Sequence, residues 1–284
     1  MTSGREPIGC IESAASKKVL FVGESIKDIY YYGRLIGRPP KEPIICVELQ
    51  GRESFEGGVM AAAEHAKPFV KNVEVFSTRK LIKERYVDGN RYRKLFEVYS
   101  GDIKWDEEMP DLSDYDMVVV LDYGHGMMTP ELIDRICVDS KFLAVNAQTN
   151  SSNFGFNLAT KYHRADYLCM DELEARLSTG NQHGPLEASL EKLHAIAPKV
   201  IVTQGKLGAT GISREGMFHS PSVTKRVVDT MGAGDAFFAV TACIAAEAGM
   251  PELLDIGNAA GALKAQSVGQ KPITKNELFG YLNR

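Results

Sequence analysis

A short stretch with two glycines and an aspartate, residues 229–237, constrains the fold of this chain more than any other feature. Gly232 and Gly234 permit backbone angles that other residues avoid, and they let a ligand approach the main chain. The apolar residues after Ala236 begin a helix, so the free N–H groups of the turn lie at a helix N-terminus, where the helix dipole favours anions. The stretch therefore predicts a strand end, a glycine turn with an anion site, and a helix start.

Asp235 places a carboxylate in the same turn. A carboxylate beside a phosphate site repels the phosphate unless it serves the chemistry, and its obvious role is to accept a proton from an attacking hydroxyl. The helix N-terminus is expected to keep this carboxylate ionised. The alternative is a helix cap beside a tight turn, the usual meaning of a lone G-x-G, but the longer string here favours the catalytic interpretation.

The composition is that of an ordinary globular protein, with 44% hydrophobic and 25% charged residues in a chain of 284. This length suits one large α/β domain or two small ones. A net charge of −4 gives no indication of nucleic-acid or membrane-surface binding. The five cysteines are scattered without a C-x-x-C pair, which favours a reducing cytoplasm over zinc or disulfides. No apolar stretch approaches the roughly 20 residues of a membrane span.

Apolar strands alternate with helical segments from residue 17 to residue 284, which we interpret as one domain. Such alternation predicts a mostly parallel sheet flanked by helices. Residues 1–16 lack the apolar core of a signal sequence and are expected to form a disordered tail. The expected strands are 17–22, 117–121, 142–146, 166–170 and 199–203, with a β-turn-β excursion at 211–219, and the expected C-terminal helices are 235–248, 251–268 and 274–283.

Two further segments, about 34–55 and 79–100, predict a small β-layer that projects from the main sheet as a lid. Prolines break the first segment before a strand at 44–49, and the turn Asp88-Gly89 between two alternating runs is a strong hairpin signal. An exposed sheet of this kind needs a partner for its apolar face, which makes a homodimer through the lid plausible.

The hairpin carries the densest cluster of positive charge in an otherwise acidic protein. These residues either bind an anion or form a solvated face that discourages strand pairing, and both readings stay open. The cluster consists of Lys83, Arg85, Arg91, Arg93 and Lys94.

The string D-T-M-G-A-G-D-A-F at 229–237 resembles the C-terminal signature of the ribokinase-like (PfkB) sugar kinases, D-T/V-x-G-A-G-D-x-F. The likeness runs from about residue 17 to the end. It is strongest to the kinases that phosphorylate the anomeric hydroxyl of D-glycero-D-manno-heptose 7-phosphate, whose opening V-G-D-x-x-x-D-x-Y-x-x-G resembles residues 22–33. The segments 83–87 and 121–129 are also similar to theirs.

The resemblance implies a ribokinase-like fold, ATP and Mg²⁺ as cofactors, and a role for each matching residue. Asp235 would be the base, and Gly232, Ala233 and Gly234 would stabilise the transferring phosphoryl group. The acceptor would lie against Asp28, Gly57, Gly58, Lys83, Arg85, Asp122 and His125. The nucleotide would lie against Thr203, Gly205, Gly208, Asn258 and Gly261. Asp171 and Glu174 would act on Mg²⁺ through its water shell.

Several positions depart from the family pattern. Ala61 replaces an asparagine in the helix after the glycine pair, His125 replaces a lysine, Glu24 and Asp171 replace Asp and Asn, and residues 146–149 read N-A-Q-T where the heptose kinases have D-P-K-G. The phosphoryl-transfer end is thus intact while the sugar-facing end is altered. We expect a cytoplasmic, ATP-dependent kinase for a small sugar or sugar phosphate.

Two alternatives stay open. One is a nucleoside or small-alcohol kinase of the same fold. The other is a catalytically weak binding protein on a kinase scaffold, or a kinase half detached from a fused nucleotidyltransferase.

Overall fold

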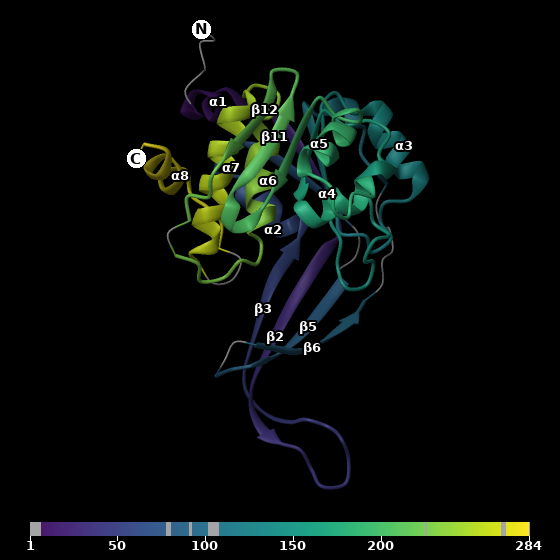
Figure 1. Cartoon of the computed structure of the whole chain (residues 1–284), viewed down its shortest axis with the longest axis vertical. Helices are drawn as coiled ribbons and strands as arrows, with labels where there is room; N and C mark the ends of the chain where they lie inside the picture. The colour runs from purple at the N-terminus through teal and green to yellow at the C-terminus, as the bar shows by residue number, and fades with distance from the viewer. Residues whose placement is uncertain are drawn as a thin grey trace.

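The computed structural model describes residues 7–77, 81–90, 93–101, 108–224, 226–267 and 271–283. Arg91 of the basic cluster lies outside these residues. The chain forms a large sheet covered by helices, from which a second, smaller sheet projects (Figure 1).

The large sheet has eight strands in the order β12-β11-β10-β9-β8-β7-β1-β4. The strands from β4 to β10 in this order run parallel, and β11 and β12 form an antiparallel excursion at one edge. The mostly parallel sheet expected from the sequence is confirmed. The strands are β1 (Lys18–Gly23), β4 (Asn72–Ser77), β7 (Met117–Asp122), β8 (Leu143–Ala147), β9 (Tyr167–Asp171), β10 (Lys199–Thr203), β11 (Ala209–Ser213) and β12 (Gly216–Ser220).

Helices cover both faces of this sheet, so its central strands are apolar except near their carboxyl ends. In β7, Met117, Val119 and Leu121 join one core, while Val118 and Val120 join the other. The first core is covered by α1 (Pro7–Ala14), α2 (Val59–Ala66), α6 (Ala233–Ile244), α7 (Met250–Ala265) and α8 (Lys275–Leu282); the second is covered by α3 (Pro130–Asp139), α4 (Glu172–Thr179) and α5 (Leu186–His194) (Figure 1). Short 3₁₀ turns occur at Leu112–Asp114, Ala159–Lys161 and Gly205–Leu207.

Two expectations about local structure are wrong. Residues 7–14 belong to no disordered tail but form α1, because Cys10, Ile11 and Ala14 lie on one helical face and are buried in the first core. The segment before the glycine turn is no strand. Its residues have no regular structure, and the N–H groups of Val228 and Asp229 donate to the carbonyl of Ala265.

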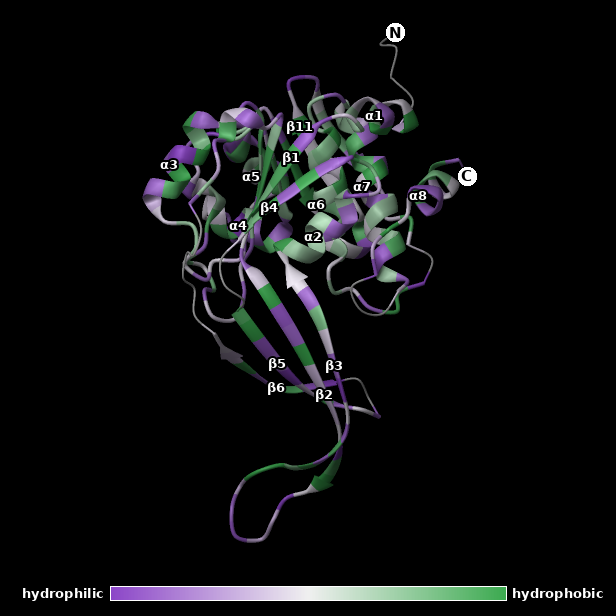
Figure 2. Ribbon diagram, turned by 180° about the vertical axis from the view of Figure 1, so that it is seen from behind, coloured by the Kyte–Doolittle hydropathy of each residue, from purple (hydrophilic) through white to green (hydrophobic). Residues whose placement is uncertain are grey.

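The smaller sheet is the predicted lid, with strand order β3-β2-β5-β6. The predicted hairpin is confirmed. The first part of the lid runs from residue 25 to residue 58, so it begins earlier and ends later than the predicted range 34–55. The long strand β2 leaves the main sheet two residues after β1, and β3 returns directly into α2, so the lid is continuous with the main sheet (Figure 2). The lid strands are β2 (Ser25–Gly37), β3 (Cys46–Gly58), β5 (Leu81–Asp88) and β6 (Arg93–Ser100).

Candidate active site

A pocket of about 160 Å³ lies at the carboxyl ends of β8, β9 and β10, against the first turn of α6. This edge is where open α/β sheets bind their ligands. The pocket brings together six of the residues predicted from the sequence: Asp171, Glu174, Thr203, Gly232, Gly234 and Asp235. Its other lining residues are Asn146, Gln148, Cys169 and Met170.

The glycine turn forms the start of α6 as predicted. Gly232 is the N-cap, has φ 74° and so occupies the left-handed region that favours glycine. Ala233 is the first helical residue, and no side chain caps the N–H groups of this turn. A Cβ on Gly234 would meet nothing within 4 Å, so this part of the turn is open. The N–H of Ala233 donates to the carbonyl of Thr230, but within the described residues the N–H groups of Gly232 and Gly234 have no hydrogen-bond partner. Unpaired donors at a helix start are the arrangement that binds anions.

The Asp235 carboxylate lines the pocket and is otherwise enclosed. Its Oδ1 accepts a hydrogen bond of 2.6 Å from Nε2 of Gln148. The Tyr123 hydroxyl lies near the same carboxylate and lowers its pKa, but it makes no hydrogen bond of ordinary geometry with any described group. Burial raises the pKa of Asp235, against the lowering effects of Gln148 and Tyr123. Burial therefore opposes the effect of the helix N-terminus, which is expected to keep Asp235 ionised.

Lys264 is a buried cation behind the glycine turn, with 1% of its surface exposed. Its Nζ donates a 2.7 Å hydrogen bond to the carbonyl of Met231. Burial lowers the pKa of Lys264, while the nearby carboxylates of Asp229 and Asp235 raise it. A positive charge therefore lies under the turn at which a phosphoryl group is expected.

Asp171 and Glu174 form the start of α4. Each side chain accepts a hydrogen bond from the backbone N–H of the other, which makes a complete capping box, and Glu174 also accepts from the N–H of Thr149. Burial and the neighbouring Asp171 raise the pKa of Glu174 to about 8. Within the described residues no group of three potential ligands could hold a metal ion directly. Both carboxylates face the pocket, so a hydrated Mg²⁺ fits them through water.

The predicted acceptor residue Asp28 lies in the lid strand β2 and is buried. Its carboxylate pairs with Arg85 in the neighbouring strand β5, and the Arg85 Nε also bonds to Glu97 at 3.0 Å. A Cβ on Gly57 would lie 2.6 Å from Asp28 Oδ2, so only glycine permits this approach. Gly58 follows directly as the N-cap of α2. The guanidinium of Arg85 therefore has two carboxylate partners within the protein, and it is not a free anion receptor.

Lys83 and His125 lie beside this pair, and each has a polar group that is available to bind a ligand. Lys83 is 7% exposed, and its Nζ lies 5.2 Å from the ring centroid of Tyr99. Among the described residues it has no carboxylate within ion-pair distance, although Asp28 acts on it electrostatically. His125 Nε2 is buried without a described hydrogen-bond partner, and burial together with Lys83 lowers the pKa of His125 to about 4. These two side chains are the groups at this end that can still recognise a ligand.

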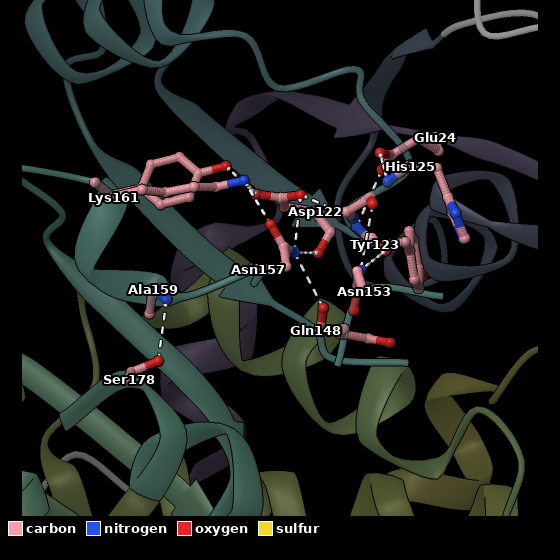
Figure 3. A network of polar contacts seen from close by, with 12 residues as sticks. Glu24, Asp122, Tyr123, His125, Gln148, Asn153, Asn157, Ala159, Lys161 and Ser178 are labelled. Atoms are coloured by element: carbon pink, nitrogen blue, oxygen red, sulfur yellow. Dashed lines mark hydrogen bonds and ion pairs between the residues drawn. The ribbon is translucent and has the colours of Figure 1, made fainter. Parts of the chain in front are cut away.

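Asp122 does not contact the acceptor side. It is fully buried, and its carboxylate takes a 2.8 Å hydrogen bond from Tyr162, one of 3.1 Å from Asn157, and an ion pair with Lys161 (Figure 3). The expectation that Asp122 binds substrate is therefore corrected, because its oxygens are already occupied. Glu24 is a second buried carboxylate whose hydrogen bonds hold the neighbouring loop in place.

Glu24 holds the loop that carries Tyr123 and His125. Its two carboxylate oxygens accept 3.0 Å hydrogen bonds from the N–H groups of these residues (Figure 3). Glu24, at the position where the family has aspartate, thus uses its longer side chain to hold this loop.

The lid also contacts the glycine turn, because the Tyr30 hydroxyl donates a hydrogen bond to the sulfur of Met231.

The residues predicted to bind nucleotide have mixed surroundings. Thr203 lines the pocket, and Gly205 begins the 3₁₀ turn that follows. Asn258 Nδ2 donates to the carbonyls of Ser220 and Pro221, so it holds the loop after β12 against α7. Gly208 packs against the same loop, and Gly261 packs against the carbonyl of Ala233. These glycines and Asn258 shape the region beside the pocket.

Sequence reasoning missed Gln148, Asn146, Tyr123 and Lys264 as site residues. The first two fall in the N-A-Q-T segment, where the departure from D-P-K-G was noted without a role. The available signal for Lys264 was a lysine among the small and apolar residues at the C-terminal end of α7.

Comparisons with known proteins show which sequences this chain is similar to. Residues 138–276 match the model of the pfkB family carbohydrate kinases. The chain is 22% identical over 303 residues to the bifunctional protein HldE of Shewanella amazonensis, covering 92% of this chain and 63% of that protein. It spans less than two thirds of the length of this relative.

Solved structures share the fold. The ribokinase of Thermotoga maritima superposes with a TM-score of 0.75 at 17% identity, covering 94% of this chain and 100% of the other. The Arabidopsis thaliana ribokinase complexed with ribose and ATP gives a TM-score of 0.73 at 17% identity, covering 95% and 99%.

These solved structures show that the chain has the ribokinase fold. The stretch at 229–237, which resembles the PfkB signature, lies within the residues that match the model of this family. In the described part of the chain, no helix has both the length and the apolar character that crossing a membrane requires.

Proposed function

We propose that this chain transfers the γ-phosphoryl group of ATP to a hydroxyl of a sugar or sugar phosphate, with Asp235 as the base. The observation that carries the proposal is the Asp235 carboxylate in the pocket at the uncapped start of α6. The likeness to a ribokinase that was solved with ribose and ATP supports it.

The residues of the proposed site have separate roles in the reaction. In the proposed arrangement the acceptor lies between Asp28 and Asp235, with its hydroxyl toward Asp235; the charge of Asp28 contributes to raising the pKa of Asp235. Asp235 takes the hydroxyl proton as the oxygen attacks, and the N–H groups of the turn at 232–234 stabilise the charge on the transferring group. A raised pKa suits this role, because a base works best when its pKa lies closer to the working pH.

Mg²⁺ would neutralise the phosphate charges, held mainly by the nucleotide and by water. Asp171 and Glu174 would orient that water shell. Glu174→Gln is then expected to raise the Mg²⁺ concentration for half activity. An unchanged titration would assign Glu174 to the helix cap alone.

We propose further that the acceptor carries an anionic group, and that Lys83 and His125 read it. This replaces the hypothesis that Arg85 does so, because Arg85 is paired with Asp28 and Glu97. A buried ammonium without an ion pair is costly unless a ligand compensates it. A phosphorylated heptose fits the motif resemblance, and the low-identity likeness to HldE gives this finer assignment weak support.

Release of ADP across a panel of sugars, sugar phosphates and nucleosides tests the proposal. Lys83→Met is expected to raise KM at least tenfold for a phosphorylated acceptor and to leave its unphosphorylated analogue nearly unchanged. Lys94→Met is the matched control, because Lys94 belongs to the same hairpin but is half exposed. A preference for neutral sugars or nucleosides that is insensitive to Lys83→Met would overturn the anionic acceptor.

We also propose that two copies of the chain associate through their lids. Apolar side chains of the lid are exposed to an extent that a monomer would not favour. They include Leu35 at 42%, Ile36 at 65%, Leu49 at 61% and Phe96 at 53%.

A further inference from the structure

A chain of amide groups connects the backbone of β9 to the Asp235 carboxylate. Asn146 Nδ2 donates a 2.7 Å hydrogen bond to the carbonyl of Cys169. Asn146 Oδ1 in turn accepts from Gln148 Nε2 at 2.8 Å, and the same Nε2 donates to Asp235 Oδ1 at 2.6 Å. Neither amide has a role in the sequence motif or in the proposed transfer step.

The backbone carbonyl at one end fixes the direction of every bond in this chain. A carbonyl can only accept, so Asn146 must turn its NH₂ toward Cys169 and its oxygen toward Gln148. Gln148 must then present its NH₂, whose two hydrogens serve Asn146 and Asp235. The opposite orientation of either amide would place lone pairs against lone pairs. Asp235 Oδ1 therefore faces a donor in the one arrangement that satisfies all the groups.

The backbone around Gln148 is fixed as well. Its N–H donates to the carbonyl of Asp122 at 2.8 Å, and its carbonyl accepts from Asn157 Nδ2 at 3.0 Å (Figure 3). Asn157 is held in turn by the Asp122 carboxylate. The amide of Gln148 is thus held from both the main chain and the side chain, as a positioning group requires.

We propose that Asn146 and Gln148 are positioning residues that keep Asp235 Oδ1 as a hydrogen-bond acceptor and leave Oδ2 to receive the proton of the attacking hydroxyl. This inference rests on the proposed role of Asp235 as the base. The hydrogen bond stabilises the carboxylate against its burial, so Asp235 can be ionised before the acceptor binds. A neutral amide does this at the place where the similar heptose kinases have the lysine of D-P-K-G.

Two substitutions of Gln148 test the inference by shifting the pH profile in opposite directions. Gln148→Met keeps the side-chain length but removes the donor, so the acid limb of kcat against pH moves to higher pH. Turnover on that limb is expected to fall on the order of tenfold, since a hydrogen bond to a charged group is lost, and to recover as the pH rises. Gln148→Lys adds a cation beside the carboxylate, so the acid limb moves to lower pH.

A change in the KM for ATP is not expected for Gln148→Met. The control is Gln266→Met, because Gln266 is exposed and bonds to its own helix. Titration of the Asp235 carboxyl carbon by ¹³C NMR in both Gln148 variants gives the same comparison without turnover, and thermal unfolding checks that each variant folds.

The outcomes separate this inference from the function on which it rests. If Asp235→Asn abolishes turnover while both Gln148 variants keep the wild-type acid limb and the wild-type carboxyl titration, the amides do not position the base. If Asp235→Asn itself turns over normally, the proposed function fails first. A loss of turnover that is equal at every pH in both Gln148 variants would indicate a structural role and would also overturn the inference.

Discussion

At the scale of single residues, the site is defined by charges that the protein buries and does not fully pair. Lys264, Lys83 and Asp235 are ionisable groups that burial disfavours in their charged forms. Such groups cost free energy in the folded chain unless a ligand compensates them, and Asp235 lines the pocket in which a ligand could do so.

Lys264 offers the clearest test of this idea. Lys264→Met is expected to lower turnover by roughly tenfold, because a cation near the transferring group is lost. The melting temperature is expected to stay equal or to rise, since a buried charge with one described hydrogen bond is replaced by an apolar side chain of similar length.

The measurements are kcat and thermal unfolding of the same preparation, with the exposed Lys71→Met as the control. A variant that unfolds at lower temperature yet turns over normally would mean that Lys264 serves only the packing of α7 against the turn.

At the scale of elements, helix starts were predictable because capping chemistry is local. Thr129 followed by Pro130 is a local signal for a helix start, and α3 has this cap, with the Thr129 hydroxyl accepting a hydrogen bond from the N–H of Leu132. Strand β10 has the predicted bounds, because a five-residue apolar run between polar loops can be interpreted only as a short buried strand.

The contribution of Glu174, in the capping box of α4, to the free energy of unfolding depends on pH. The pKa of Glu174 is raised from 4.5 to about 8 by burial, so folding favours its protonated form. This contribution to stability is fully present below pH 4.5 and is lost as the pH rises through about 8. Its size is a few kcal/mol at most, since one pKa unit is about 1.4 kcal/mol. Glu174→Gln is expected to remove this loss of stability between pH 5 and pH 8 in the protein without nucleotide or metal.

The free energy of unfolding, measured by denaturant titration at several pH values, checks the expectation. Glu277→Gln in the capping box of α8 is the matched control, because its partners lower the pKa of Glu277, so its contribution is lost only as the pH falls. A wild-type pH dependence in Glu174→Gln would contradict the assignment.

What the sequence could not predict has physical causes at the same scale. The strand β2, which carries Asp28, is absent from the strands expected from the sequence, because polar and aromatic residues interrupt its apolar run. It lies in a sheet with one exposed face, where polar residues are allowed. Helix α1 was missed because its apolar face is only three residues wide. Gln148 was missed because its role depends on Asp235, which lies 87 positions away.

At the scale of the whole molecule, the proposed function requires the lid and the helical body to form one site. The lid supplies Asp28 and Lys83, the body supplies Asp235, and the Tyr30–Met231 contact links the two. The exposed apolar side chains of the lid lie away from the two cores, on strands β2, β3 and β6 and the turn between β2 and β3 (Figure 2).

If the lids of two copies associate, a charge on the apolar lid surface must weaken the dimer. Leu49→Asp is expected to convert a dimer to a monomer at micromolar concentration, because a carboxylate would be buried without a partner. Light scattering after size exclusion gives the mass. Val138→Asp is the control, since Val138 is 73% exposed on α3. A wild-type chain that is monomeric at all concentrations would contradict the proposal.

The central claim is that Asp235 accepts the proton of the attacking hydroxyl, and Asp235→Asn tests it most directly. The measurement is the rate of ADP formation under saturating ATP and acceptor, together with the Kd for ATP. The account predicts a fall in kcat of about 10²–10⁴-fold, the usual effect of losing a positioned base, with an ATP affinity close to that of the wild type. Turnover near the wild-type rate would contradict it.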